Sequence, residues 1–157
     1  MRPPRAQPLN FDRLADCLAL ASRGYRHTVI DAPRLPPDIT AMLVSNSTSV
    51  VLLFQLTVKD LRVARNILDT LDDRGIPRSQ VIAVANRFAK RPPIGLDEAG
   101  KVLGGMTVRW LRNDYTAALE GINYGKPLAQ ASPKSVLRRD ILDLLPTLVP
   151  GYASRGR

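Results

Sequence analysis

Two continuous apolar runs constrain the fold of this chain more than any other feature. Residues 50–55 read VVLLFQ and residues 81–86 read VIAVAN. A strand that is apolar at consecutive positions is buried on both faces, which is typical of a parallel sheet covered by helices. Between the runs, a segment that begins at Thr57 carries a helical apolar stripe and ends before Gly75. The sequence therefore predicts a strand–helix–strand unit.

The same alternation of strands and helices extends to both sides of this unit. Helices are expected over about 11–22, 39–45, 96–103, 114–123 and 134–146, with further strands over about 26–31 and 107–111. Ser132 is the expected cap of the last helix. The order predicts an α/β fold in which helices flank a parallel sheet of about four strands, in a Rossmann-like three-layer arrangement.

The chain is basic. Its 157 residues, a usual size for one domain, contain 23 Lys and Arg against 14 Asp and Glu, which gives a net charge of +9. Arg87, Lys90 and Arg91 lie together in a loop after the second apolar run. Such an excess favours anionic partners, so one interpretation of the chain is a basic module that binds nucleic acid, such as DNA, or an acidic membrane surface.

Cysteine and histidine usage excludes several kinds of site. Cys17 is the only cysteine, which rules out an internal disulfide and a cysteine-based zinc cluster. It occupies an apolar position of the first helix and is predicted to be a small core residue. The sole histidine, His27, is a poor metal ligand without a second histidine or cysteine. No apolar stretch reaches the length of a membrane span, so we expect a cytoplasmic protein, with peripheral attachment to the inner membrane left open.

Polar side chains follow the strands where the carboxyl ends of a parallel sheet would gather. Asp31 ends the first predicted strand, Asn86 and Arg87 end the third, and Asn113 and Asp114 follow the last. An aspartate at that place can hold a Mg²⁺-bound water, or it can close its strand through a local turn. An asparagine there can pair with an adenine edge or can be a turn residue. Asp114 is most simply a helix cap.

The sequence contains no convincing phosphate-binding loop. The one G-x-x-x-x-G-K match is GLDEAGK at residues 95–101, and Val102 follows it where a hydroxyl should contact Mg²⁺. Asp97 and Glu98 would also place two negative charges beside the phosphates. We therefore predict that this segment is a helix with exposed charges.

Several segments together resemble the MinD/ParA class of deviant P-loop ATPases, and within it the CpaE/TadZ-type proteins of Flp pilus assembly. VIDAP at 29–33 resembles the Walker B strand, residues 50–71 resemble the strand and helix after it, and VIAVANRF at 81–88 resembles the strand that ends in the adenine-reading asparagine. LNFDRLADCLALASRGYRHTVID at 9–31 and INYGKPLAQASPKS at 122–135 extend the match. Their order and spacing carry the resemblance more than any single motif does.

The resemblance implies ATP and Mg²⁺ as cofactors and a role for each matching residue. Asp31 would hold Mg²⁺ through water, Pro33 would shape the loop after it, Asn86 would read adenine with Arg87 beside it, and Asn113 and Asp114 would line the base pocket. The P-loop with its lysines, the receiver-like region and the switch I aspartate of that family have no counterpart in these residues. Arg112 also stands where the family often has proline.

A missing P-loop has chemical and structural consequences. The P-loop supplies most phosphate contacts and the catalytic lysine, so we expect no ATP hydrolysis by this chain alone. The P-loop strand normally lies beside the Walker B strand in that family. Its absence would leave a gap there, or it would make residues 27–31 pair directly with residues 50–54.

We therefore expect residues 9–148 to form the C-terminal domain of such an ATPase without its P-loop, between a disordered basic tail at 1–8 and a basic tail at 149–157. Its expected role is in pilus assembly or localisation, as a scaffold among pilus or secretion assembly proteins, or as one half of a split ATPase that binds ATP with a P-loop-bearing partner chain. A homodimer is a further option. The alternative is the basic binding module. A receiver-like regulator phosphorylated on Asp31 is a weaker candidate, because no acidic pair stands at a preceding strand end.

Overall fold

The computed structural model of the chain describes residues 13–32, 35–149 and 151–152. The chain divides into two compact units, Met1–Ser47 and Thr48–Arg157. All three strands of the sheet belong to the second unit. None of the helices in the described part of the chain is long and apolar enough to cross a membrane.

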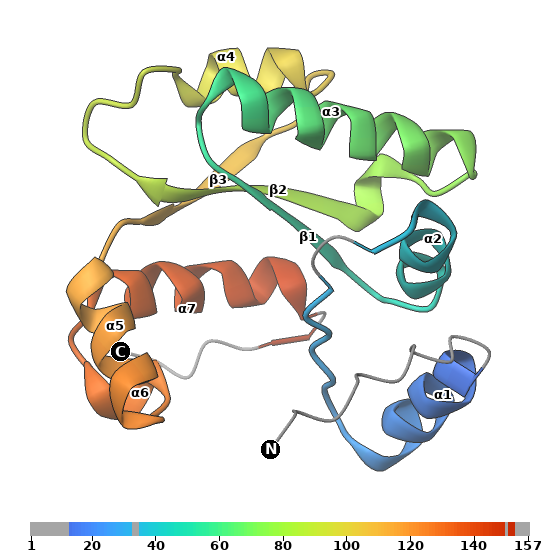
Figure 1. Ribbon diagram of the computed structural model, residues 1–157, viewed down its shortest axis with the longest axis horizontal. Helices are drawn as coiled ribbons and strands as arrows, with labels where there is room; N and C mark the ends of the chain where they lie inside the picture. The colour runs from blue at the N-terminus through green and yellow to red at the C-terminus, as the bar shows by residue number, and fades with distance from the viewer. Residues whose placement is uncertain (1–12, 33–34, 150, 153–157) are drawn as a thin grey trace, which may run out of the picture. The chain divides into compact units, whose positions relative to one another are not determined.

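The second unit is built on a parallel sheet. Its strands are β1 (Val50–Phe54), β2 (Val81–Phe88) and β3 (Val108–Arg112), in the order β1-β2-β3. Helices α3 (Val58–Asp73) and α4 (Leu96–Val102) lie over one face of the sheet, and α7 (Val136–Leu148) lies over the other (Figure 1). Helices α5 (Tyr115–Tyr124) and α6 (Leu128–Ala131) pack on each other, and a 3₁₀ turn (Arg78–Gln80) leads into β2. The predicted α/β fold with helices on both faces is confirmed.

The central strand forms the core of this unit. Ala83, Val84 and Ala85 of β2 are completely buried, as the continuous apolar run predicts for a strand covered on both faces. Leu68 of α3 and Leu103 after α4 are almost completely buried in the same unit. Burying one such leucine stabilises the fold by about 1.5–3 kcal/mol. The apolar stripe of α3 therefore fixes this helix on the sheet.

Two helix starts follow the local signals in the sequence. The Thr57 side chain accepts a hydrogen bond from the Asp60 backbone N–H at 3.1 Å, which confirms the predicted cap of α3. Asp114 caps α5 in the same way. The predicted cap of the last helix was wrong, because α7 is capped by Ser135 instead of Ser132. The Ser135 hydroxyl accepts from the Leu137 and Arg138 N–H groups.

The first unit contains α1 (Leu14–Gly24) and α2 (Pro37–Ser45). The strand predicted over 26–31 is wrong, since residues 27–32 have no regular secondary structure and Val29 is 94% exposed. A strand needs a neighbouring strand to satisfy its backbone groups, and residues 27–31 pair with no strand of the described sheet. The described sheet consequently has three strands, one fewer than expected. Cys17 is exposed, so its prediction as a core residue was also wrong.

Candidate functional site

The carboxyl ends of the three strands form the candidate site. Because the strands are parallel, Gln55 after β1, Asn86 near the end of β2 and Asn113 after β3 come to one edge of the sheet. The Asn113 backbone N–H donates to the Phe88 carbonyl oxygen at 3.2 Å, which holds the end of β3 against the end of β2. The predicted arrangement, in which Asn86 and Asn113 follow neighbouring parallel strands at one edge of the sheet, is confirmed.

A β-bulge places Asn86 at this edge. Ala85 pairs with Trp110 and Phe88 pairs with Arg112, so Asn86 and Arg87 together face one residue of β3. Arg87 has a φ of 53°, a left-handed conformation that is uncommon for any residue except glycine. The Asn86 side-chain oxygen accepts from the Arg87 N–H at 2.9 Å. Among the described residues no hydrogen bond engages the Asn86 amide nitrogen, which stays available as a donor.

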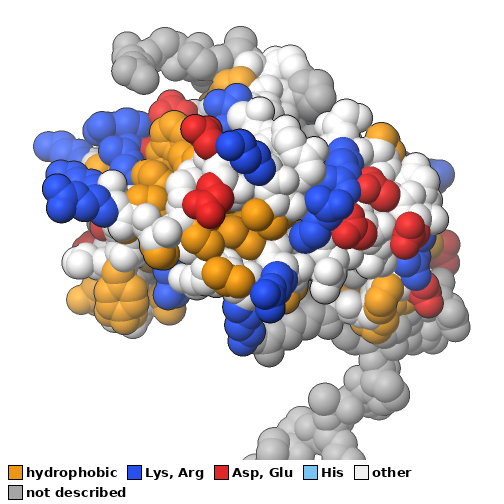
Figure 2. All heavy atoms as spheres, turned by 90° about the horizontal axis from the view of Figure 1, so that it is seen from above, with side chains coloured by type: hydrophobic (Ala, Val, Ile, Leu, Met, Phe, Trp, Pro, Cys, Tyr) orange, Lys and Arg blue, Asp and Glu red, His pale blue; other side chains and the backbone are white. Residues whose placement is uncertain are grey.

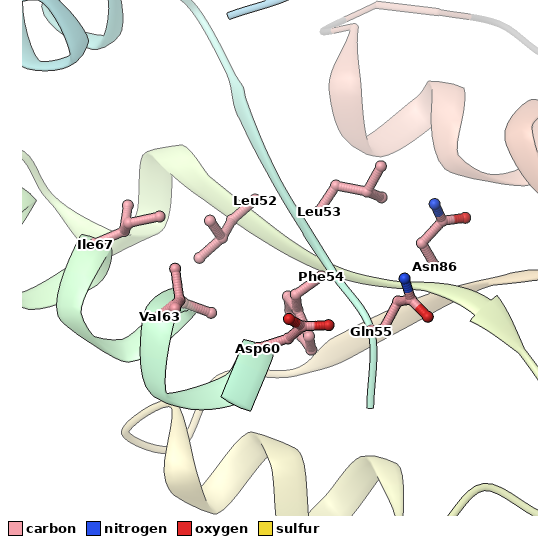
Figure 3. Close-up of a pocket in the computed structure, with 9 residues that line it drawn as sticks. Leu52, Leu53, Phe54, Gln55, Asp60, Val63, Ile67 and Asn86 are labelled. Atoms are coloured by element: carbon pink, nitrogen blue, oxygen red, sulfur yellow. The ribbon is translucent and has the colours of Figure 1, made fainter. Parts of the chain in front are cut away.

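A hollow of about 230 Å³ opens beside these amides. It lies between β1 and α3, with the Gln55 and Asn86 amides and the Asp60 carboxylate around its polar end (Figure 3). Its apolar walls come from Leu52, Leu53, Phe54, Val63, Ala64 and Ile67. The hollow is thus suited to a flat apolar group with a polar edge. No lysine or arginine is among the residues that line the hollow. Sequence reasoning missed Asp60, although its place in the first turn of a helix after a strand was a signal.

Asp114 has a structural task. Its carboxylate accepts from the Ala117 N–H at 3.3 Å and from the Ser135 hydroxyl at 2.7 Å. The pKa of Asp114 is lowered, mainly because the Ser135 hydroxyl donates a hydrogen bond to its carboxylate. Desolvation opposes this shift, and hydrogen bonds from backbone N–H groups add to it. The carboxylate therefore joins the start of α5 to the start of α7. Asn113 beside it is exposed.

Arg112 also has a structural partner. Its guanidinium donates to both carboxylate oxygens of Asp140, and its backbone N–H donates to Asp140 at 2.8 Å. Asp140 is 7% exposed. Burial raises the pKa of Asp140, but the Arg112 hydrogen bonds and charge outweigh it and leave this pKa below its ordinary value. The arginine that departs from the family pattern is thus bound to α7 at the end of β3.

The G-x-x-x-x-G-K match is helical, as predicted. Residues 96–102 form α4, and a Cβ atom at Gly100 would lie 2.6 Å from the Met106 carbonyl oxygen. Gly100 therefore allows close packing of α4 against the chain before β3. The described residues 95–101 therefore form a helix start and a helix instead of a phosphate-binding loop.

Two residues implied by the resemblance belong to the first unit. Asp31 is exposed and lies in the first unit, outside any strand. Pro33 lies outside the described residues. No group of three histidine, cysteine or acidic side chains in the described part of the chain is placed to hold a metal ion. The described part of this edge thus presents the Gln55, Asn86 and Asn113 amides, and the hollow beside it is lined by one carboxylate, that of Asp60.

The fold is similar to that of a ParA family ATPase from Chlorobium tepidum TLS, as seen in its crystal structure. The TM-score is 0.77 at 22% sequence identity, over 87% of this chain and 56% of that chain. The chain thus has an α/β fold similar to a ParA-type P-loop NTPase and spans little more than half the length of that ATPase. No protein-family model matches the sequence. No curated protein matches it either.

Proposed function

We propose that this chain is the base-binding part of a ParA/MinD-type ATPase and that it does not hydrolyse ATP alone. Its expected setting is that of CpaE/TadZ-type proteins, in pilus assembly or localisation, where it acts as a scaffold or as an ATP binder that depends on a partner. One observation carries the proposal. The Gln55 and Asn86 amides line one hollow beside an apolar wall, while no phosphate-binding loop accompanies them in the described residues.

The chemistry of the edge supports adenine better than phosphate. An amide donates and accepts at once, which matches the paired donor and acceptor of the adenine edge. The apolar wall from Leu52 to Ile67 can contact the flat faces of a base (Figure 3). Phosphates need backbone N–H groups and a lysine, and these must come from a loop outside the 157 residues. With such a loop present, Asp31 would have a Mg²⁺-bound water to orient.

The test is ATP binding by the purified chain, alone and with a candidate partner. The partner is the polypeptide encoded beside this chain, provided that its sequence contains a strand, a glycine-rich P-loop and a helix. We expect no ATP binding by this chain alone and Mg²⁺-dependent binding by the pair. Asp31→Ala should weaken the Mg²⁺-dependent part, whereas Asp16→Ala, at an exposed helix position, should not. Mg²⁺-dependent ATP turnover by the chain alone, lost in Asp31→Ala, would contradict the proposal.

A basic surface gives the second candidate function, binding to DNA or to an acidic membrane. Arg87, Lys90 and Arg91 are exposed on and after the end of β2. Figure 2 shows Lys and Arg side chains gathered at one end of the visible face. Binding of this kind falls steeply with salt because counterions are released. Binding to duplex DNA or to acidic vesicles at low salt, reduced in a variant with all three side chains changed to Ala, would support it. No binding at low salt would exclude it.

A further inference from the structure

Strands β2 and β3 carry an exposed aromatic pair near their carboxyl ends. The ring centroids of Phe88 and Trp110 lie 5.9 Å apart, with the ring planes tilted by 40°. Phe88 is in register with Arg112, so it lies diagonally across the two strands from Trp110, within reach of aromatic side chains. Trp110 is 45% exposed. The pair thus holds the indole ring in place while much of the Trp110 surface stays open to solvent.

Four basic residues flank the aromatic pair along the two strands and the loop after β2. All four are exposed: Arg87, Lys90, Arg91 and Arg109. Arg87 directly precedes Phe88 in β2, and Arg109 occupies the same place before the tryptophan of β3. The other two lie in the loop that leaves β2 and leads to α4 (Figure 1). The farther of them follows Phe88 by three positions, which keeps the two Cα atoms within about 11 Å. One short ligand can therefore contact both rings and charges.

The four basic side chains have no acidic partner. None of them forms a hydrogen bond or an ion pair with the described part of the chain. Segments 81–95 and 104–113, which carry them, contain no aspartate or glutamate. The next acidic residues along the chain are Asp97 and Glu98 of α4 and Asp114, the cap of α5. An anionic ligand would thus meet positive charges that no carboxylate of these segments offsets.

Exposed rings beside unpaired positive charges are the features that bind single-stranded nucleic acid. The bases of a single strand stack on aromatic side chains, and its phosphates follow the basic side chains next to them. The bases of a duplex are stacked on each other, so a duplex could use the charges of this surface but not its rings. The aromatic pair therefore favours a single strand over duplex DNA as the ligand.

We propose that Phe88, Trp110 and the four basic residues form an aromatic–basic surface that binds single-stranded nucleic acid. One base stacks on Trp110, and the phosphates on either side of it contact the basic side chains. All of these residues belong to the second unit. The inference rests on the second candidate function, whose ligand it specifies, and it does not depend on ATP binding. Single-stranded DNA and RNA share bases and phosphodiesters, so the test includes both.

The fluorescence of the full chain tests the stacking directly, because Trp110 is its only tryptophan. The chain is titrated with oligothymidylate and with oligouridylate of about eight nucleotides. An abasic strand of the same length supplies the same phosphates without bases. We expect the base-containing strands to quench the fluorescence and to bind about tenfold more tightly than the abasic strand. Four phosphate contacts predict a slope of log affinity against log salt of about −2.8.

Variants separate stacking from charge and from packing within the sheet. With a labelled oligonucleotide and fluorescence anisotropy, Trp110→Ala should weaken binding about tenfold, while Trp110→Phe keeps most of it. Tyr124→Ala, at an exposed aromatic residue of α5, is the matched control and should bind as the wild type does. Lys90→Ala should reduce the salt slope by about 0.7, whereas Lys59→Ala, at an exposed position of α3, should not.

Circular dichroism melts check that each variant folds. If Trp110→Ala fails to fold, the comparison of base-containing and abasic strands on the wild-type chain decides. Quenching by only one of oligothymidylate and oligouridylate supports the proposal and identifies DNA or RNA as the source of the strand.

The inference and the second candidate function fail differently. Equal affinity for the base-containing and abasic strands without quenching would overturn the aromatic–basic surface and leave binding by charge alone. Tighter binding of a duplex with the same number of phosphates would have the same meaning, as would binding to acidic vesicles without binding to either single strand. Wild-type affinity in a folded Trp110→Ala variant would also overturn it. No binding to any of these ligands at low salt would show that both are wrong.

Discussion

The guanidinium of Arg112 and the carboxylate of Asp140 form a two-pronged ion pair that joins the end of β3 to α7. The Arg112 backbone N–H donates to the same carboxylate, so Asp140 accepts from both the main chain and the side chain of one residue. Because the carboxylate is buried, it depends on these donors. The pair therefore fixes the strand end from which Asn113 extends to the candidate site.

We predict that Asp140→Ala destabilises the chain by about 1–3 kcal/mol, since it leaves the Arg112 N–H and guanidinium without their acceptor. The measurement is urea unfolding followed by circular dichroism. Asp73→Ala is the control, because Asp73 is exposed at the end of α3. Equal losses of stability in the two variants would show that the ion pair contributes nothing specific.

The Asp140 carboxylate should make the free energy of unfolding depend on pH in the acidic range. The pKa of Asp140 lies below its ordinary value in the folded chain, so protons bind the unfolded chain more readily than the folded one. The stabilisation is complete above the pKa in the unfolded chain, about 3.9, and is lost as the pH falls through the lower pKa of the folded chain.

We therefore expect the difference in unfolding free energy between the wild type and Asp140→Asn to be largest near about pH 7 and to shrink below about pH 4. Urea unfolding over that range measures it. The pKa of Asp114 is also lowered, first through the Ser135 hydroxyl, so some acid sensitivity should remain in the variant. A difference that grows on acidification would show that the sign is wrong.

Strands and helices were predicted well where the signal is local. The apolar runs of β1 and β2, the stripe of α3 and its Thr57 cap are all contained in short stretches of sequence. The strand expected at 26–31 is different, because Thr28, Val29 and Ile30 favour a strand but can form one only beside another strand. Its failure reflects a missing neighbour, which a local pattern does not reveal.

The site was predictable in outline and not in its contacts. Parallel strands bring Asn86 and Asn113 to one edge whatever their side chains do. The bulge at Arg87 and the pairing of Arg112 with Asp140 depend on residues that meet only after folding. The choice between Ser132 and Ser135 as a cap is of the same kind, since Ser135 is favoured by its contact with Asp114.

Gly100 offers a test of the α4 packing. We predict that Gly100→Ala costs about 1–3 kcal/mol, because the added methyl group would lie 2.6 Å from the Met106 carbonyl oxygen, a backbone atom that cannot move aside freely. Gly95→Ala in the same sequence match should cost less, since its methyl group would meet open space. Thermal unfolding of both variants measures the difference. A larger loss in Gly95→Ala would contradict the packing role of Gly100.

The last prediction concerns Asn86 and the nucleotide base. In the assembly of this chain with a P-loop-bearing partner, Asn86→Ala should weaken ATP binding about tenfold, the equivalent of about 1.4 kcal/mol for a lost polar contact. It should also reduce the preference for ATP over GTP, because the amide matches the donor and acceptor of adenine. Asn66→Ala, at an exposed position of α3, is the control. Titration with both nucleotides separates the two cases: weaker binding with an unchanged preference would mean that Asn86 only shapes the bulge with Arg87.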